Sequence, residues 1–262
     1  MENNNDNKNK LPVLKNNTLI YKGKFISYFI KNYEIKNKSN NNNISIPYES
    51  VDYNSRYFNQ NEIKNEFIGK NKYNIYAVNI IPIIKYTSKA QKLIIVSVFR
   101  YPINKFCLEF PAGFMDKSDI SGKNFSKALE IATLRELEEE TGYKGKFLSF
   151  TSEFFSKNNK NLENQLKLGS NIFFDPWKSS DNAIQCIVEI NGDEITNNNK
   201  KSQKLDDSEI IQVFEVEINH LMKFINEKIS KENYGCSSEL YNFALGLSFN
   251  SVLTVIESKE NE

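Results

Sequence analysis

The sequence is poor in histidine, in cysteine and in long apolar runs. Its one histidine is His220, so a mechanism that needs a Ser–His, Cys–His or His–phosphate pair has a single candidate residue. That residue lies where a predicted strand passes into a predicted helix, which favours a surface or capping position. General-base chemistry would therefore come from a carboxylate or from a metal site.

The cysteines Cys107, Cys186 and Cys236 are odd in number, widely spaced and without a CxxC pattern. This predicts reduced thiols packed in the core of a cytoplasmic protein and argues against a zinc site. No stretch approaches the roughly 18 uninterrupted apolar residues of a membrane span, and segment 1–10 has no apolar core of a signal peptide. We therefore expect neither a membrane segment nor a secretory leader.

The formal net charge is +1, and no segment concentrates lysine and arginine, so we expect no long nucleic acid as a partner. With 262 residues and 39% hydrophobic content, the chain can bury a substantial core. We expect a disordered Asn-rich tail over 1–18, N-terminal strands over 19–60 that mediate dimerisation, and one main domain over 61–256.

Apolar periodicity predicts an α+β protein in which strands and helices interleave. Strands are expected at 23–35, 44–53, 75–86, 93–101, 106–110, 145–156, 183–191 and 209–217. Helices are expected at 124–141, 219–229 and 237–249.

The predicted helix 124–141 ends in a group of acidic residues. At 100° per residue, Glu136, Glu139 and Glu140 project within one face, where the helix dipole already presents partial negative charge. Such a placement suits a hard divalent ion with oxygen ligands, and we interpret it as a Mg²⁺ or Mn²⁺ site. The alternative is a solvated acidic helix end without a ligand. An Arg135–Glu139 ion pair at i,i+4 spacing would brace the site.

Residues 135–143, Arg-Glu-Leu-Glu-Glu-Glu-Thr-Gly-Tyr, match the second half of the Nudix box at every fixed position, and a Pro-Ala-Gly turn precedes them at 111–113. The chain therefore resembles the Nudix hydrolases. The first half of the pattern departs from the family, because Lys127 stands where the family has a bracing Glu and Gly113 lies too far upstream. About eight residues are inserted within 116–124, or else Gly122 and Lys123 form the equivalent turn.

Further landmarks resemble the ADP-ribose pyrophosphatase branch of that family. They are found at 23–25, 48–51, 98–102, 108–113, 175–176, 190–193 and 241–247. The resemblance implies substrate contacts from Phe25, Tyr48, Arg100, Ala112 and Gly113, with the two aromatic rings stacking on adenine. At the position of Tyr53, the branch has an arginine that helps to hold the substrate. The replacement of this arginine weakens the choice of ADP-ribose over other nucleoside diphosphate sugars.

Taken together, the resemblance implies a Nudix fold, which is an α/β/α sandwich of mixed sheets around the acidic helix with an N-terminal β extension. It implies a Mg²⁺-dependent homodimer that cleaves ADP-ribose to AMP and ribose 5-phosphate, with metal ligands Glu136, Glu139 and Glu140. Glu209, in an acidic loop, is the candidate base, with Asp206 and Asp207 as rivals and Glu139 and Arg135 as further catalytic residues. The alternatives are a UDP-sugar, GDP-sugar or oxidised nucleoside diphosphate as substrate, or a non-catalytic nucleotide-binding protein.

Overall fold

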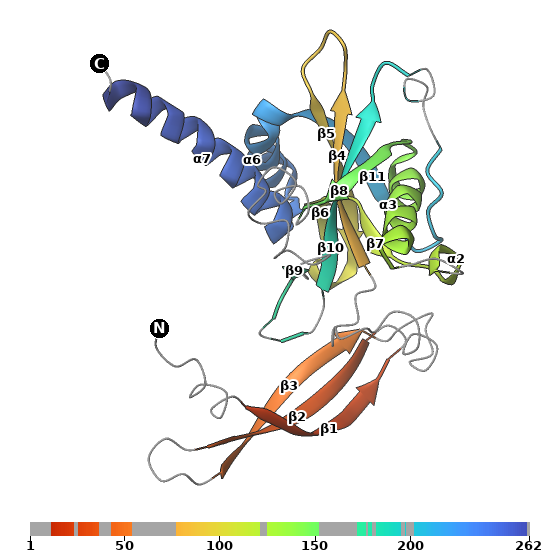
Figure 1. The fold of residues 1–262 in the computed structure, drawn as a ribbon, viewed down its shortest axis with the longest axis vertical. Coiled ribbons are helices and arrows are strands. Elements are labelled where there is room, and N and C mark those ends of the chain that lie inside the picture. The colour runs from red at the N-terminus through yellow and green to blue at the C-terminus, as the bar shows by residue number, and fades with distance from the viewer. Residues whose placement is uncertain are drawn as a thin grey trace. The chain divides into compact units, whose positions relative to one another are not determined.

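The computed structural model describes residues 12–23, 26–36, 43–53, 77–120, 125–151, 172–176, 178–179, 182–194, 197 and 202–260. The chain divides into two units (Figure 1). The first contains 1–74 with 171–183, and the second contains 75–170 with 184–262. The division after residue 74 differs from the boundary expected at residue 60.

The secondary structure follows the predicted order of elements closely. The strands are β1 (Val13–Lys22), β2 (Ile26–Lys36), β3 (Asn43–Tyr53), β4 (Ala77–Lys85), β5 (Lys92–Arg100), β6 (Lys105–Glu109), β7 (Ala112–Phe114), β8 (Lys146–Phe150), β9 (Ile172–Phe173), β10 (Asn182–Asn191), β11 (Ile211–Glu217) and β12 (Gly235–Cys236). The helices are α2 (Lys117–Ile120), α3 (Phe125–Thr141), α6 (Leu221–Glu232) and α7 (Ser238–Glu260), with 3₁₀ turns η2 (Tyr101–Ile103) and η3 (Ile218–His220).

In the first unit, β1, β2 and β3 form an antiparallel sheet in that order. Strand β1 begins at Val13, so the prediction of a tail over 1–18 is wrong for residues 13–18. The polar run Asn16-Asn17-Thr18 concealed this strand. The low β-propensity of these residues is offset by pairing with β2. The side chain of Asn32 in β2 donates to that of Asn16 at 2.6 Å.

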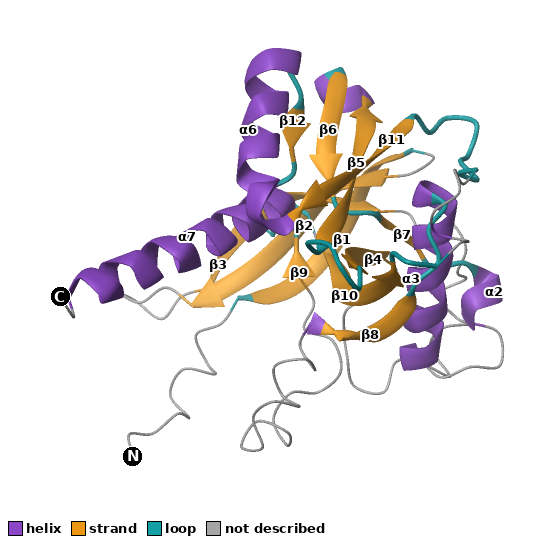
Figure 2. Ribbon diagram, turned by 90° about the horizontal axis from the view of Figure 1, so that it is seen from above, coloured by secondary structure: helices purple, strands orange, loops and turns teal. Residues whose placement is uncertain are grey.

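In the second unit, a mixed sheet is covered by helices on both faces (Figures 1 and 2). Strand β4 pairs in parallel with β10 and antiparallel with β5. Helix α3 packs on one face of the sheet, where Leu129 and Ala132 join the core, and α6 and α7 pack on the other through Ile225 and Leu240. Central strands buried on both faces read as continuous apolar runs, which explains the sequences of β4 and β5. The predicted α/β/α layering is confirmed.

Cys107 and Cys186 are buried and His220 is exposed, as the sequence predicts, whereas Cys236 is only partly buried. All three cysteines are free thiols, and burial raises the pKa of Cys107 to about 12, so this thiol is protonated and inert at neutral pH. His220 is 66% exposed and lies 3.2 Å from the Glu217 carboxylate. No described helix is long and apolar enough to cross a bilayer.

Candidate active site

The acidic end of α3 is closed by a glycine and by a distant loop. Gly142 adopts a φ of 73°, a left-handed conformation that glycine tolerates without strain, and its N–H donates to the Glu138 carbonyl at 2.8 Å. The Lys204 N–H donates to the Glu139 carbonyl at 2.8 Å, and Gln203 Nε2 donates to the Glu140 carbonyl at 2.6 Å. Loop 202–210 is therefore anchored on the last turn of α3, next to the acidic side chains.

Gly113 lies directly against the Glu136 carboxylate. A Cβ atom placed on Gly113 would stand 2.1 Å from Glu136 Cδ, so only glycine leaves room for that side chain. The segment 112–114 forms strand β7, paired with β4, instead of the isolated turn that the Pro-Ala-Gly sequence suggests. This close approach identifies Gly113 as the glycine that serves the acidic helix, whereas Gly122 lies outside the described residues.

We expect Gly113→Ala to move the Glu136 carboxylate and to raise the Kd for Mn²⁺ about 10- to 100-fold. The free energy of unfolding should stay within about 1 kcal/mol of wild type, because the displaced atoms are the flexible end of a side chain. Isothermal titration and urea unfolding measure the two quantities.

The matched control for this change is Gly246→Ala in α7, where no atom lies within 4 Å of an added Cβ. This control should gain about 0.5–1 kcal/mol of stability and keep wild-type Mn²⁺ affinity. Wild-type affinity in Gly113→Ala as well would contradict the steric assignment.

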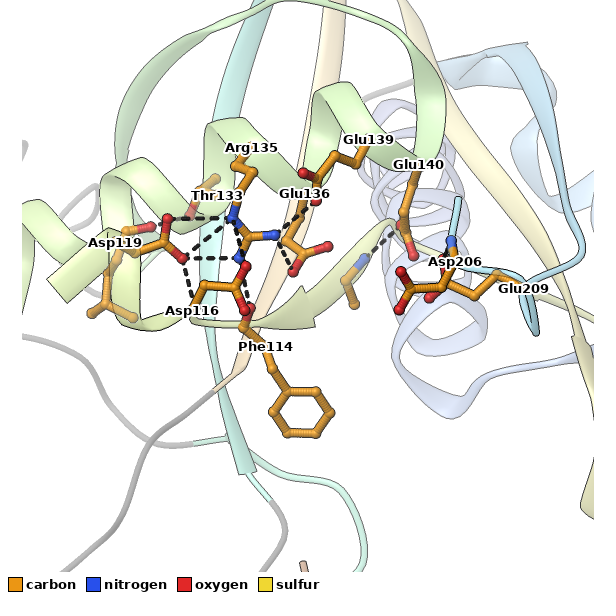
Figure 3. A network of polar contacts seen from close by, with 12 residues as sticks. Phe114, Asp116, Asp119, Thr133, Arg135, Glu136, Glu139, Glu140, Asp206 and Glu209 are labelled. Atoms are coloured by element: carbon orange, nitrogen blue, oxygen red, sulfur yellow. Dashed lines mark hydrogen bonds and ion pairs between the residues drawn. The ribbon is translucent and has the colours of Figure 1, made fainter. Parts of the chain in front are cut away.

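Arg135 organises the acidic face of α3 (Figure 3). Its Nη1 donates to Glu136 Oε1 at 2.9 Å and to Glu139 Oε2 at 2.8 Å, so the predicted i,i+4 ion pair is present. Its Nη2 donates to the Phe114 carbonyl at 2.7 Å and to Asp119 Oδ2 at 2.9 Å. The guanidinium therefore ties α3 to β7 and to α2 at once.

Glu140 is the most deeply buried of the three glutamates, at 8% exposed. Burial, with the negative charges of Glu136 and Glu209, raises its pKa well above the usual range. The Ala112 N–H donates to its Oε2 at 3.0 Å and opposes that rise. The backbone group that was predicted to approach substrate is thus committed here to Glu140.

The carboxyl group of Glu136 is also buried without enough positive charge nearby to offset the cost of ionisation. Burial raises its pKa to about 7, although Arg135 acts in the opposite direction and Glu139 and Asp116 add to the rise. Buried carboxylates whose negative charge is penalised in this way are stabilised in their ionised form by a hard divalent cation, which prefers oxygen ligands. In the described part of the chain, however, no three acidic, histidine or cysteine side chains are arranged to hold a metal ion as they stand. Arg135 draws Glu136 and Glu139 toward itself, so ion binding requires these side chains to move.

The raised pKa of Glu136 predicts how metal-free stability depends on pH. Because the folded-state pKa of about 7 exceeds the ordinary 4.5, the folded protein holds a proton that the unfolded chain has lost, and stability falls as the pH rises from about 4.5 to 7. We expect Glu136→Gln to be more stable than wild type by about 1–3 kcal/mol at pH 8 in EDTA, and by much less at pH 4. Urea unfolding at the two pH values measures this, and a variant less stable than wild type at pH 8 would exclude a charge penalty at Glu136.

The other predicted site residues of the second unit lie around this centre. Arg100 ends β5 and donates through two nitrogens to Glu109, at 2.8 and 2.5 Å. Its positive charge also lowers the pKa of Glu140, against the larger effect of burial. Glu209 lies on loop 202–210, where its Oε2 accepts from the Asp206 N–H at 2.9 Å, and Figure 3 shows both residues beside Glu140. Tyr48 lies exposed on β3 of the first unit, and Phe25 lies outside the described residues.

Sequence reasoning missed Asp119 and Gln203. Asp119 lies on α2, within the segment treated as an insertion, and only its spacing of three residues from Asp116 hinted at a turn. Gln203 follows an Asn- and Lys-rich run, and nothing in the local sequence signals that it caps a helix some sixty residues earlier.

Three known proteins resemble this chain over about 65% of its length. The ADP-sugar pyrophosphatase of Mus musculus is 30% identical over 171 residues, and the ADP-ribose pyrophosphatase of Saccharomyces cerevisiae is 29% identical over 173. A nudix hydrolase of Caenorhabditis elegans is 31% identical over 175 residues. The matched region spans 66%, 62% and 66% of these proteins, just under two thirds of each. No family model matches the chain.

Proposed function

We propose that the chain is a Nudix hydrolase and that it hydrolyses the pyrophosphate bond of ADP-ribose or a related nucleoside diphosphate sugar. The observation that carries the proposal is the group of buried or half-buried glutamates Glu136, Glu139 and Glu140 around Arg135. Relatives named for ADP-ribose and ADP-sugar cleavage support the choice of substrate.

In the proposed reaction, a water oxygen forms a bond to one phosphorus atom and the P–O–P bridge breaks on the far side of that phosphorus. With ADP-ribose, the bridging oxygen leaves on one phosphate, and the products are AMP and ribose 5-phosphate. One water proton must be removed as the new bond forms. Negative charge grows on the phosphoryl oxygens, so the site has to supply positive charge and a base.

Mg²⁺, or Mn²⁺ in its place, is part of the proposal. Glu136, Glu139 and Glu140 would hold it, because their carboxylate oxygens are the donor type that these ions prefer and the raised pKa values of Glu136 and Glu140 show a demand for positive charge. A bound divalent cation supplies positive charge to the phosphoryl oxygens.

The chain's own residues would do the remaining work. Glu209 is the proposed base, since loop 202–210 carries it to the last turn of α3 beside Glu140. Arg100 is the proposed phosphate ligand, and it would exchange Glu109 for substrate. Phe25 and Tyr48 remain the proposed adenine contacts, and the backbone of Ala112 and Gly113 would border the diphosphate.

The test is a substrate panel. ADP-ribose, a UDP-sugar, a GDP-sugar and 8-oxo-dGDP are compared by kcat/KM in Mg²⁺ and in EDTA, with products separated by chromatography. The proposal expects the highest kcat/KM for ADP-ribose with AMP as product, and no turnover in EDTA. A higher kcat/KM for another compound of the panel would overturn ADP-ribose as the proposed substrate. Absence of hydrolysis of all four compounds would overturn the proposed hydrolase activity.

We also propose a homodimer in a cytoplasmic setting. A three-stranded sheet alone buries little apolar surface. Strands β1–β3 expose many large apolar side chains, a pattern typical of a protein–protein interface. They are Val13, Leu14, Leu19, Ile20, Tyr21, Ile26, Ile44, Ile46 and Tyr48. Light scattering should give about twice the chain mass of 30.4 kDa, whereas a monomer at micromolar concentration would contradict the assembly.

A further inference from the structure

The antiparallel pairing of β5 with β11 continues one position before β11 begins, because the Phe99 N–H donates to the Ile210 carbonyl at 3.0 Å. In the same register, the next position pairs Arg100, the proposed phosphate ligand, with Glu209, the proposed base. The charges of both side chains act on the pKa of Glu140, and Figure 3 shows Glu209 beside that residue. The register of the ladder therefore brings together two groups that the proposed reaction needs at one phosphate.

Loop 202–210 is fixed where it leaves α3. The Gln203 side chain donates to the Glu140 carbonyl at 2.6 Å and to the Ile211 carbonyl at 3.2 Å, so it joins the end of α3 to the start of β11. Beyond this anchor lies a short turn that contains Glu209 and is closed by hydrogen bonds within the loop. The position of the proposed base therefore depends on what holds this turn.

Tyr101 contacts the turn from outside the loop. Its hydroxyl donates to the carbonyl of Ser208, the residue before Glu209, at 3.3 Å. Although Tyr101 is 63% exposed, its ring is held edge-on against Phe99, with ring centroids 5.2 Å apart. Its own carbonyl accepts from the Asn104 N–H at 3.2 Å, which closes the 3₁₀ turn η2. An exposed side chain held in this way can fix a neighbouring segment, because it has little further conformational freedom to lose.

We propose that Tyr101 is a positioning residue for the base, acting through Glu209; this rests on the proposed function. The hydroxyl holds the turn on the side of Arg100, so that the Glu209 carboxylate stays within reach of a water molecule beside the phosphate that Arg100 would bind. A base is effective only when it is held close to its productive geometry. In this role Tyr101 does not touch the substrate.

The kinetic test is a double-mutant cycle in the full-length protein with Mg²⁺, using the panel compound with the highest kcat/KM. Tyr101→Phe keeps the ring and its contact with Phe99 but removes the hydroxyl. A contact of 3.3 Å is a weak hydrogen bond, so we expect kcat to fall about three- to tenfold and KM to change less than about twofold. In the Glu209→Gln background, the same change should lower kcat less than about 1.5-fold, because Tyr101 acts through Glu209.

Hydrogen–deuterium exchange tests the same contact without substrate. The amides of Asp206 and Glu209, which are hydrogen-bonded within the turn, should exchange about two- to tenfold faster in Tyr101→Phe than in wild type. Tyr234→Phe is the matched control, since it removes a tyrosine hydroxyl that donates to the Gln212 side chain of β11 at 3.1 Å. Its kcat and the exchange of the turn should stay within about 1.5-fold of wild type.

Wild-type kcat in Tyr101→Phe, with an active wild-type enzyme, would overturn the positioning role. Equal losses of kcat in the wild-type and Glu209→Gln backgrounds would also overturn it, and so would unchanged exchange of the turn. Absence of turnover of every panel compound by wild type would refute the proposed function. The exchange measurement needs no substrate, so it would still decide whether Tyr101 holds the turn.

Discussion

Glu139→Gln is expected to lower kcat for ADP-ribose hydrolysis about 10³-fold, which corresponds to about 4 kcal/mol of lost transition-state stabilisation. The variant keeps an oxygen that can accept from Arg135 Nη1 but loses the charge that the proposed cation requires. Stability should change by less than about 1 kcal/mol, because the side chain is 34% exposed and its ion pair contributes little to folding. Stopped assays of AMP formation and urea unfolding give the two quantities.

The adjacent Glu138→Gln variant is the matched control. Glu138 is 35% exposed on the same helix turn, but its partners are Lys144 and Lys204 at 3.7 and 3.6 Å, away from Arg135. Its kcat should stay within about twofold of wild type. Equal losses in the two variants would show that general helix charge, and not the position of Glu139, supports activity.

Glu209→Gln should reduce kcat about 10²-fold or more while changing KM by less than about threefold, because a general base acts mainly in the transition state. Its Oε2 accepts from the Asp206 N–H, an interaction that a glutamine oxygen preserves, so the loop should keep its shape. The measurement is kcat against pH at saturating Mg²⁺ and substrate.

Asp207→Asn tests the neighbouring rival for the same role. Asp207 lies exposed in the same turn, and no more than a twofold change in kcat is expected. If Asp207→Asn were the slow variant and Glu209→Gln remained fast, the identity of the base would be wrong while the metal site could stand.

The acidic helix was predictable because its signals are local. Apolar spacing set its register, Gly142 fixed its end, and Arg135 with Glu139 followed from i,i+4 geometry. Strands β4 and β5 were predictable for a similar reason, since buried central strands read as runs of Val, Leu and Ile.

What the sequence did not reveal depends on contacts between distant segments. Strand β1 has a polar centre, Asn16-Asn17-Thr18, and is stabilised by its pairing with β2. Gln203 caps the end of α3 although it lies 63 residues after Glu140 in the sequence. Asp119, which contacts Arg135, lies in a segment that was interpreted as an insertion. The contact between Arg135 and Glu136 was also not predictable, because helical spacing does not specify that these neighbouring side chains meet.

The most direct measurement is AMP formation from ADP-ribose by the wild-type protein, titrated with Mg²⁺ after removal of metal by EDTA, beside the triple variant Glu136→Gln, Glu139→Gln, Glu140→Gln. The account predicts that activity is absent in EDTA, returns in a saturable manner with Mg²⁺, and never returns in the triple variant. Hydrolysis that persists in EDTA, or that Mg²⁺ restores in the triple variant, would contradict it.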